Sequence, residues 1–141
     1  RARSECAAAA TADLGVILVD TSVWVDHLRT GDKVLAALLG AGAVLTHPFV
    51  VGELALGNLH QRETILNALS DLPPATVATD AEVLHFIGDQ ALFGRGIGYV
   101  DAHLLAAVRL TAGAELWTND KRLYGVAEQL GLATTPARPG S

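Results

Sequence analysis

The chain has 141 residues, half of them apolar, with one cysteine and a formal net charge of -5 at pH 7. This length suits one well-buried domain rather than two, and a single cysteine excludes both a disulfide framework and a cysteine metal cage within the chain. No apolar run reaches the roughly 18 residues of a membrane span, so a cytoplasmic protein is expected, and the acidic balance is the opposite of the usual signature of nucleic-acid binding.

Residues 1–15 read as an Ala-rich leader that precedes the first element. Its run of four alanines is too weak an apolar core for an export signal. Because the chain contains no Met, we expect Val16 to be the original start, read from a valine-type initiation codon, with 1–15 as a non-native leader. We expect one domain over 16–136 and a flexible tail over 137–141.

Short β-rich runs alternate with longer helical patterns through this domain. In chain order, the predicted elements are a strand at 16–19, helices at 23–28 and 33–39, a strand at 43–47, helices at 48–59 and 63–69, a strand at 76–80, helices at 81–92 and 99–111, a strand at 115–120, a helix at 121–130 and an edge strand at 133–135. This alternation predicts a three-layer α/β/α fold with a short, mainly parallel central sheet.

An aspartate stands at the carboxyl end of the first and of the fourth predicted strand. "VILVDTS" places Asp20 directly after the first strand, and "LWTND" places Asp120 at the end of the fourth. In parallel sheets, ligands bind beyond the carboxyl ends of the strands, so both carboxylates are expected at one functional edge. A simpler interpretation is helix capping, by Asp20, Thr21 or Ser22 for the first helix and by Asp120 or Asn119 for the last.

Glu53 and Asp101 lie on predicted helices among apolar or small neighbours. The residues three and four positions away from each are valine, leucine, isoleucine, phenylalanine or glycine. A solvated carboxylate would have polar neighbours there, so both are candidate site residues. For Asp101, a role as the N-cap of its own helix is the alternative.

Several neighbouring carboxylates repel one another, and burial raises their pKa values further. A divalent cation removes this cost, and an all-oxygen ligand set without His or Cys favours Mg²⁺ or Mn²⁺ over zinc. Such an ion can bind phosphate oxygens and activate water, which would also let an acidic protein act on a polyanion. The five histidines are scattered without metal-ligand spacing, and we expect them to be structural or surface residues.

The segments "ILVDTSVW", "VVGELALG", "GYVDAHLLAA" and "LWTNDKRL", in this order, resemble the PIN-domain ribonucleases, in particular the VapC toxins of bacterial VapBC toxin–antitoxin pairs. The resemblance covers nearly all of residues 17–136. It implies that Asp20, Glu53, Asp101 and Asp120 form an acidic cluster that holds Mg²⁺ or Mn²⁺ for endonucleolytic cleavage of RNA. Asp120 would complete this cluster or bind a second, weaker ion.

The resemblance also implies supporting residues and partners. By position, Thr21 or Ser22, Thr118 and Asn119 match the polar residues that orient the carboxylates or a bound water. Members of the family are usually homodimers, neutralised by a cognate VapB-type antitoxin that lies across the active site. The alternative function is a catalytically silent PIN-like module that only binds RNA or a partner.

Five further residues have two interpretations each. Arg95, Lys121 and Arg122 flank the acidic motifs and are candidate substrate-binding residues or ordinary surface cations. Trp24 and Leu28 make the first helix apolar on more than one face, which indicates either core packing or an exposed groove for an amphipathic antitoxin helix.

Overall fold

The computed structural model describes residues 15–136. Apart from Gly15, the predicted leader and tail lie outside the described residues. The central sheet has three parallel strands in the order β2-β1-β3, formed by β1 (Val16–Val19), β2 (Val44–Leu45) and β3 (Ala114–Trp117). Their carboxyl ends therefore meet at one edge, where the chain leaves β1 at Asp20 and β3 at Thr118.

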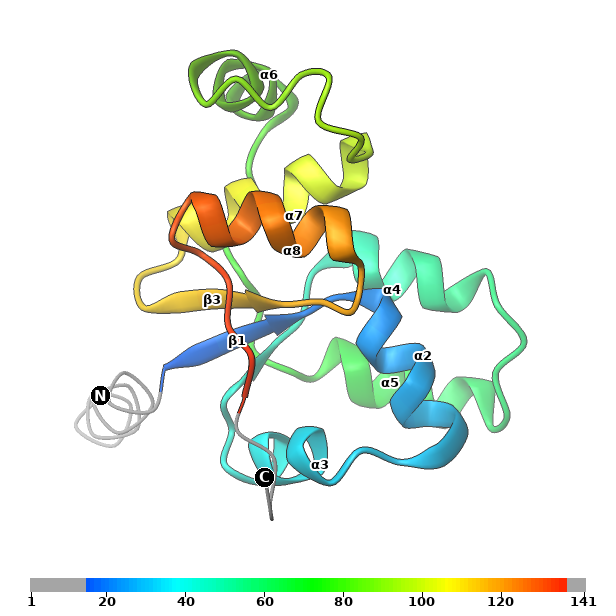
Figure 1. Cartoon of the computed structure of the whole chain (residues 1–141). Coiled ribbons are helices and arrows are strands. Elements are labelled where there is room, and N and C mark those ends of the chain that lie inside the picture. The colour runs from blue at the N-terminus through cyan, green and yellow to red at the C-terminus, as the bar shows by residue number, and fades with distance from the viewer. Residues whose placement is uncertain (1–14, 137–141) are drawn as a thin grey trace, which may run out of the picture.

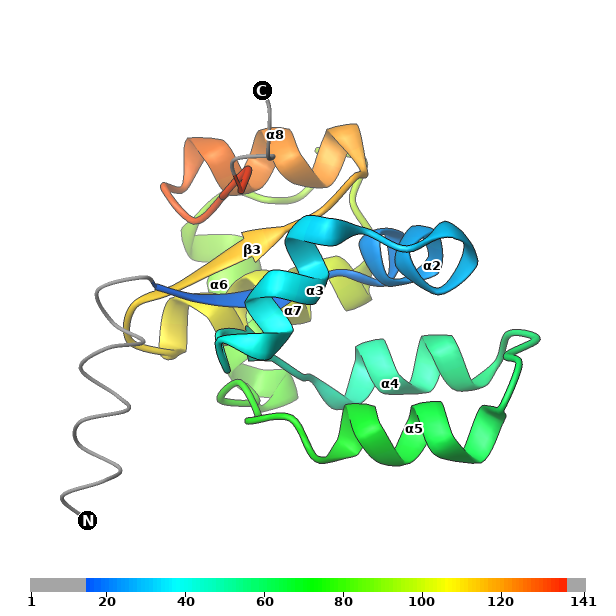
Figure 2. The ribbon, with the colours of Figure 1, turned by 90° about the horizontal axis from the view of Figure 1, so that it is seen from below.

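The helices cover both faces of this sheet, with α7 on one side and α3 on the other (Figures 1 and 2). They are α2 (Thr21–Thr30), α3 (Lys33–Gly40), α4 (Pro48–Ala55), α5 (Arg62–Ser70), α6 (Asp80–Asp89), α7 (Tyr99–Leu110) and α8 (Lys121–Gln129). The predicted three-layer α/β/α fold with a short parallel sheet is confirmed. None of the described helices is long and apolar enough to cross a membrane.

The core lies between β1 and the helices on either face. Leu18 and Leu116 on neighbouring strands and Leu104 and Leu105 on α7 are fully buried. Because β1 is paired on both edges and covered on both faces, all its positions after the first must be apolar, which explains the continuous "ILV" run. The same burial fixes the direction in which the chain emerges at Asp20.

The predicted strand at 76–80 is wrong. The structure has no strand at these residues, and a single bridge between Thr46 and Pro74 lies just before them in the chain. Thr79 instead begins α6 with a capping box, in which its hydroxyl accepts the Glu82 N–H and the Glu82 carboxylate accepts the Thr79 N–H. The reciprocal cap outweighs the β preference of the Thr and Val residues.

Several predicted elements are shorter than expected, among them an edge strand and a helix. The edge strand at 133–135 reduces to one bridge between Leu116 and Ala133. The helix predicted over 48–59 ends at Ala55, because Leu56 begins a turn and Gly57 and Asn58, which disfavour helix, follow it. Neither change moves a candidate site residue, since Glu53 stays within α4.

Candidate active site

Asp20 occupies the N-cap position of α2, but its side chain does not cap the helix. Its buried carboxylate accepts hydrogen bonds at Oδ2 from the Ser22 hydroxyl at 2.8 Å and from the Thr118 hydroxyl at 2.7 Å. The capping interpretation is therefore wrong for the Asp20 side chain. Both donors hold the carboxylate at the edge of the sheet between β1 and β3.

The predicted supporting residues connect the chain segments that follow β1 and β3. The Ser22 hydroxyl accepts the Asn119 N–H at 3.0 Å, and the Thr118 hydroxyl accepts the Asp120 N–H at 3.0 Å. Thr21 donates to Glu53 Oε1 at 2.7 Å, which links α2 to α4. The side-chain amide of Asn119 points elsewhere and donates to Asp26 at 3.0 Å.

Replacing Thr118 with Val is expected to lower the free energy of unfolding by about 1–3 kcal/mol, because a buried carboxylate loses a donor without a change in side-chain shape. Thr118→Ser keeps the hydroxyl and serves as the matched control. Urea unfolding of both variants in metal-free buffer measures the effect. Equal stability of the Val and Ser variants would show that the bond to Asp20 is not needed.

Asp101 and Asp120 are each fixed by the start of a helix. Asp101 is the third residue of α7 and accepts the N–H of Gly98, the N-cap, at Oδ2 over 3.0 Å. It therefore takes part in the cap without being the N-cap itself. Asp120 is the N-cap of α8, as the capping interpretation predicted, and accepts the Leu123 N–H at Oδ1 over 3.0 Å. The positive end of each helix favours the charged carboxylate.

The four carboxylates share one pattern. Each uses one oxygen for the hydrogen bonds described above, which are Oδ2 of Asp20, Oε1 of Glu53, Oδ2 of Asp101 and Oδ1 of Asp120. The second oxygen of each accepts no hydrogen bond from residues 15–136. The arrangement thus orients four acidic groups while leaving one acceptor oxygen on each for another ligand.

The charges of these groups act on one another. Burial raises the pKa of Asp101, and the hydrogen bond from Gly98 works in the opposite direction. The negative charges of Asp20, Asp120 and Glu53 raise the same pKa further. Four side chains from four different segments therefore share one electrostatic environment.

A hard divalent cation fits this donor set, because its ligands are carboxylate oxygens and it neutralises the repulsion that raises the Asp101 pKa. As placed, no three His, Cys, Asp or Glu side chains among residues 15–136 form a ready-made metal site. Binding an ion would therefore require the free oxygens to draw closer together, and the exposed Glu53 side chain on α4 has room to move.

The three predicted substrate cations have different surroundings. Arg95 donates to Gln129 at the end of α8 over 2.6 Å. Arg122 lies against the loop at Gly96, whose left-handed φ of +80° and close contact leave no room for a side chain. Within residues 15–136, none of Arg95, Lys121 and Arg122 forms an ion pair with a carboxylate, so their charges are available to an anion.

Trp24 is only 4% exposed and belongs to the core, so the interpretation of Trp24 as part of an exposed groove is wrong. The tryptophan faces inward, where Leu39 of α3 and Ile65 of α5 line the same small cavity. Leu28 is partly buried and lines a cavity next to Glu53. Core packing explains Trp24, and Leu28 lies at the border between core and groove.

Sequence reasoning missed His47, which positions the helix that carries Glu53. His47 is fully buried, and its Nδ1 accepts the Phe49 N–H at 3.0 Å, which caps α4. Burial and the neighbouring charge of His103 lower the pKa of His47 to about 4. The signal in the sequence was a polar residue directly before Pro48 at a helix start.

Residues 17–129 match the PIN domain family model. The chain belongs to the PIN-domain family. Two similar proteins are both named "Ribonuclease VapC32", from Mycobacterium tuberculosis strains CDC 1551 / Oshkosh and ATCC 25618 / H37Rv. Each is 49% identical over 118 residues, which cover 84% of this chain and 95% of the relative.

Proposed function

We propose that this protein is the toxin of a VapBC-type toxin–antitoxin pair and acts as a metal-dependent endoribonuclease. One observation carries the proposal, namely four oriented carboxylates with one free oxygen each at a single sheet edge. The 49% identity to proteins named ribonuclease over nearly their whole length supports RNA as the substrate. An acidic pI of about 5.4 is compatible with this substrate if a cation offsets the site.

In this proposal, Asp20, Glu53 and Asp101 hold a Mg²⁺ or Mn²⁺ ion directly or through water, and Asp120 completes the set or holds a second ion. When bound, such an ion stabilises charge at the scissile phosphate and activates water for in-line attack. The protein's own residues orient the carboxylates and the RNA backbone. Thr118 fixes the Asp20 carboxylate, while Lys121 and Arg122, directly after Asp120, offer cations to the RNA backbone.

Cleavage of a total RNA pool tests the proposed activity. Purified protein free of antitoxin is incubated with the pool in EDTA, Mg²⁺ or Mn²⁺, and the products are sequenced at their ends. Discrete fragments that form only with a divalent ion are expected. Folded protein that binds RNA and cleaves none of it with either ion would contradict the proposal and favour a catalytically silent binding module.

For the antitoxin, we propose a groove between α2 and the segment that follows α4. A cavity of about 400 Å³ lies there, with Val25, Leu28, Leu54 and Ile65 among its apolar walls and Glu53 in its lining. An amphipathic antitoxin helix placed on these apolar residues would reach the acidic cluster. This location explains how one partner could both bind tightly and block the site.

Val25→Asp is expected to weaken antitoxin binding about tenfold or more, because it places a charge on the apolar wall of the groove. Val77→Asp is the matched control, since Val77 is similarly exposed (47% against 41% for Val25) and lies before α6 rather than in the groove. Calorimetric titration with the cognate antitoxin measures both. Equal affinities of the two variants would place the antitoxin elsewhere.

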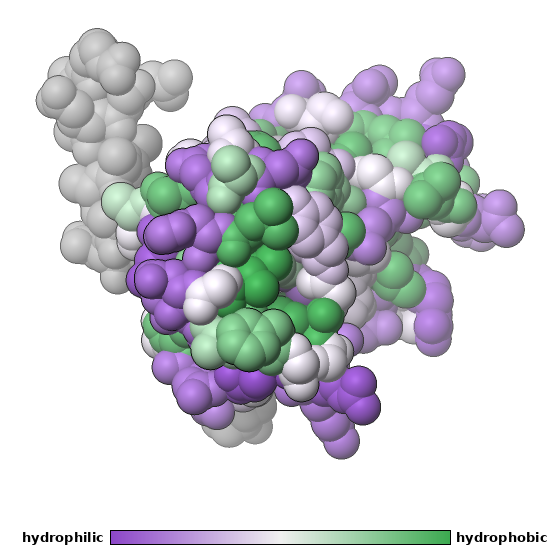
Figure 3. Space-filling model, turned by 90° about the horizontal axis from the view of Figure 1, so that it is seen from above, coloured by the Kyte–Doolittle hydropathy of each residue, from purple (hydrophilic) through white to green (hydrophobic). Residues whose placement is uncertain are grey.

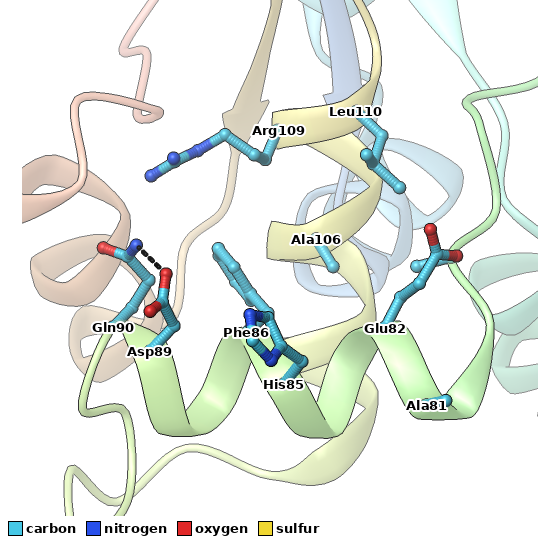
Figure 4. A pocket seen from close by; sticks show the side chains of 10 residues that line it. Ala81, Glu82, His85, Phe86, Asp89, Gln90, Ala106, Arg109 and Leu110 are labelled. Atoms are coloured by element: carbon cyan, nitrogen blue, oxygen red, sulfur yellow. Dashed lines mark hydrogen bonds between the residues drawn. The ribbon is translucent and has the colours of Figure 1, made fainter.

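For the homodimer, we propose the face formed by α6 and α7. Figure 3 looks onto this side of the molecule, where apolar side chains gather among polar ones, and Leu84 and Leu110 are exposed there. A cavity of about 420 Å³ lies between the two helices. Phe86 points from α6 toward Arg109 on α7 (Figure 4), with the guanidinium carbon 5.6 Å from the ring centre.

Leu84→Asp is expected to convert a dimer into a monomer, because a charge at the centre of an apolar interface is desolvated without a partner. Leu56→Asp is the control, as Leu56 is also exposed but lies at the end of α4. Light scattering coupled to size-exclusion chromatography, at matched concentrations, reports the mass. A Leu84 variant that stays dimeric would exclude this face.

A further inference from the structure

Two exposed aromatic side chains flank the loop that leads to Asp101. Phe93 is 69% exposed and Tyr99 is 46% exposed. Both line a cavity of about 240 Å³ between the end of α6, the loop at 90–98 and the first turn of α7. Gly98 also lines this cavity, and its N–H is the group that binds the Asp101 carboxylate. The cavity therefore adjoins the acidic site.

Tyr99 is held in a fixed orientation. Its hydroxyl donates to Asp80 Oδ1 at 3.0 Å, and its ring meets the buried His103 ring edge-on, with centroids 4.8 Å apart. His103 Nε2 lies 3.1 Å from the same oxygen of Asp80. Because the bond to Asp80 and the contact with the His103 ring fix the Tyr99 ring before any ligand arrives, a stacked ligand would find a surface that is already ordered.

The same loop also has positive charge next to it. The Arg122 guanidinium lies against Gly96, and Arg95, one residue earlier, reaches across to α8. Cations and exposed rings thus meet at one loop, in a chain whose formal net charge is -5. Cations beside aromatic rings are the combination that binds single-stranded nucleic acid, the cations along the backbone and the rings against the bases.

We infer that this cavity receives the base of a nucleotide next to the scissile phosphate of a single-stranded RNA, stacked against Phe93 and Tyr99. The backbone of that nucleotide then passes Arg122 toward Asp101. The inference rests on the proposed ribonuclease function and adds a base-binding subsite to it. Stacking tolerates every base, so this subsite contributes affinity and places the backbone with little sequence preference.

The test measures binding without cleavage, in an Asp101→Asn parent. Fluorescence anisotropy compares a short, labelled single-stranded RNA of mixed sequence with an abasic RNA of the same length. Adding Phe93→Ala to the parent is expected to weaken binding of the base-containing RNA about tenfold and to change binding of the abasic RNA little. Phe93→Tyr keeps a ring and should retain the affinity. Val77→Ala removes an exposed apolar side chain before α6 that does not line this cavity, and it should have no effect.

Three results would overturn the subsite. The first is an equal loss of affinity for the base-containing and the abasic RNA, and the second is no loss of affinity for either. The third is a change from dimer to monomer on Phe93→Ala with unchanged affinity for RNA, which would assign the rings to a second copy of the chain. Failure of the proposed function looks different, because the unmodified protein would then cleave no RNA with Mg²⁺ or Mn²⁺. If the protein cleaves RNA and Phe93→Ala leaves its KM unchanged, the subsite is contradicted while the proposed ribonuclease function stands.

Discussion

Replacement of Asp101 with Asn is expected to lower RNA cleavage about a thousandfold or more. The change removes one charge from the proposed ion site, and ion-assisted charge stabilisation contributes several kcal/mol, with about a factor of ten in rate for each 1.4 kcal/mol. The geometry should survive, because the Asn side-chain oxygen can still accept the Gly98 N–H. Initial rates on one RNA substrate, at saturating Mg²⁺, measure the loss.

The same substitution is expected to stabilise the metal-free protein at neutral pH. Burial and three neighbouring charges raise the pKa of Asp101 in the folded state. The folded protein therefore binds a proton more readily than the unfolded chain, and stability falls as pH rises through the window above the ordinary Asp pKa. Asn carries no charge and removes this cost.

Asp89→Asn is the control for both effects, since Asp89 is an exposed aspartate on α6. It should leave the cleavage rate and the midpoint of thermal unfolding near those of the unmodified protein. An Asp101 variant that cleaves RNA at the normal rate would remove Asp101 from the site. One that is less stable than the Asp89 variant in EDTA would show that repulsion within the cluster is minor.

Acidification is expected to destabilise the fold through His47, by roughly 3 kcal/mol between pH 7 and pH 4. The pKa of His47 falls from 6.5 to about 4 on folding, and each pKa unit corresponds to 1.36 kcal/mol. Between these pH values His47 is protonated in the unfolded chain and neutral in the folded protein. The free energy of unfolding therefore declines as pH falls through 6.5 and levels off below about 4.

His47→Asn isolates this contribution. Asn is a good N-cap residue and can keep the bond to the Phe49 N–H, but it does not titrate. Urea unfolding across this pH range should show a shallower decline for the variant than for the unmodified protein. His85→Asn, an exposed histidine on α6, is the control. Parallel pH profiles for all three proteins would show that His47 does not govern acid stability.

The parts of the fold that depend on local pattern could be predicted from the sequence. Val16–Val19 is a strand because a parallel strand buried on both faces must be continuously apolar. The segment at 76–80 has similar β preference, but its Thr79 and Glu82 satisfy the first amides of α6, and no neighbouring strand competes for them. Local preference alone does not distinguish a strand from a helix start at these segments, because the outcome depends on which groups are available to hydrogen-bond with the backbone.

The candidate site also has features that could be predicted from the sequence and features that could not. Asp20 and Asp120 could be placed together because parallel strands end at one edge of a sheet. The bond between Thr118 and Asp20 joins residues 98 positions apart, and no periodicity in the sequence reports it. The prediction of Trp24 as part of an exposed groove failed for a related reason. A helix that is apolar on several sides does not reveal which side meets the core, and the packing of α2 buries the tryptophan.

The most direct test of a single cation site formed by the four carboxylates is calorimetric titration of Mn²⁺ into metal-free protein. The unmodified protein is compared with Asp101→Asn and Asp89→Asn. Saturable binding by the unmodified protein and the Asp89 variant, with binding greatly weakened in the Asp101 variant, is the predicted result. Equal binding by all three proteins, or cleavage of RNA by protein that binds no divalent ion, would contradict it.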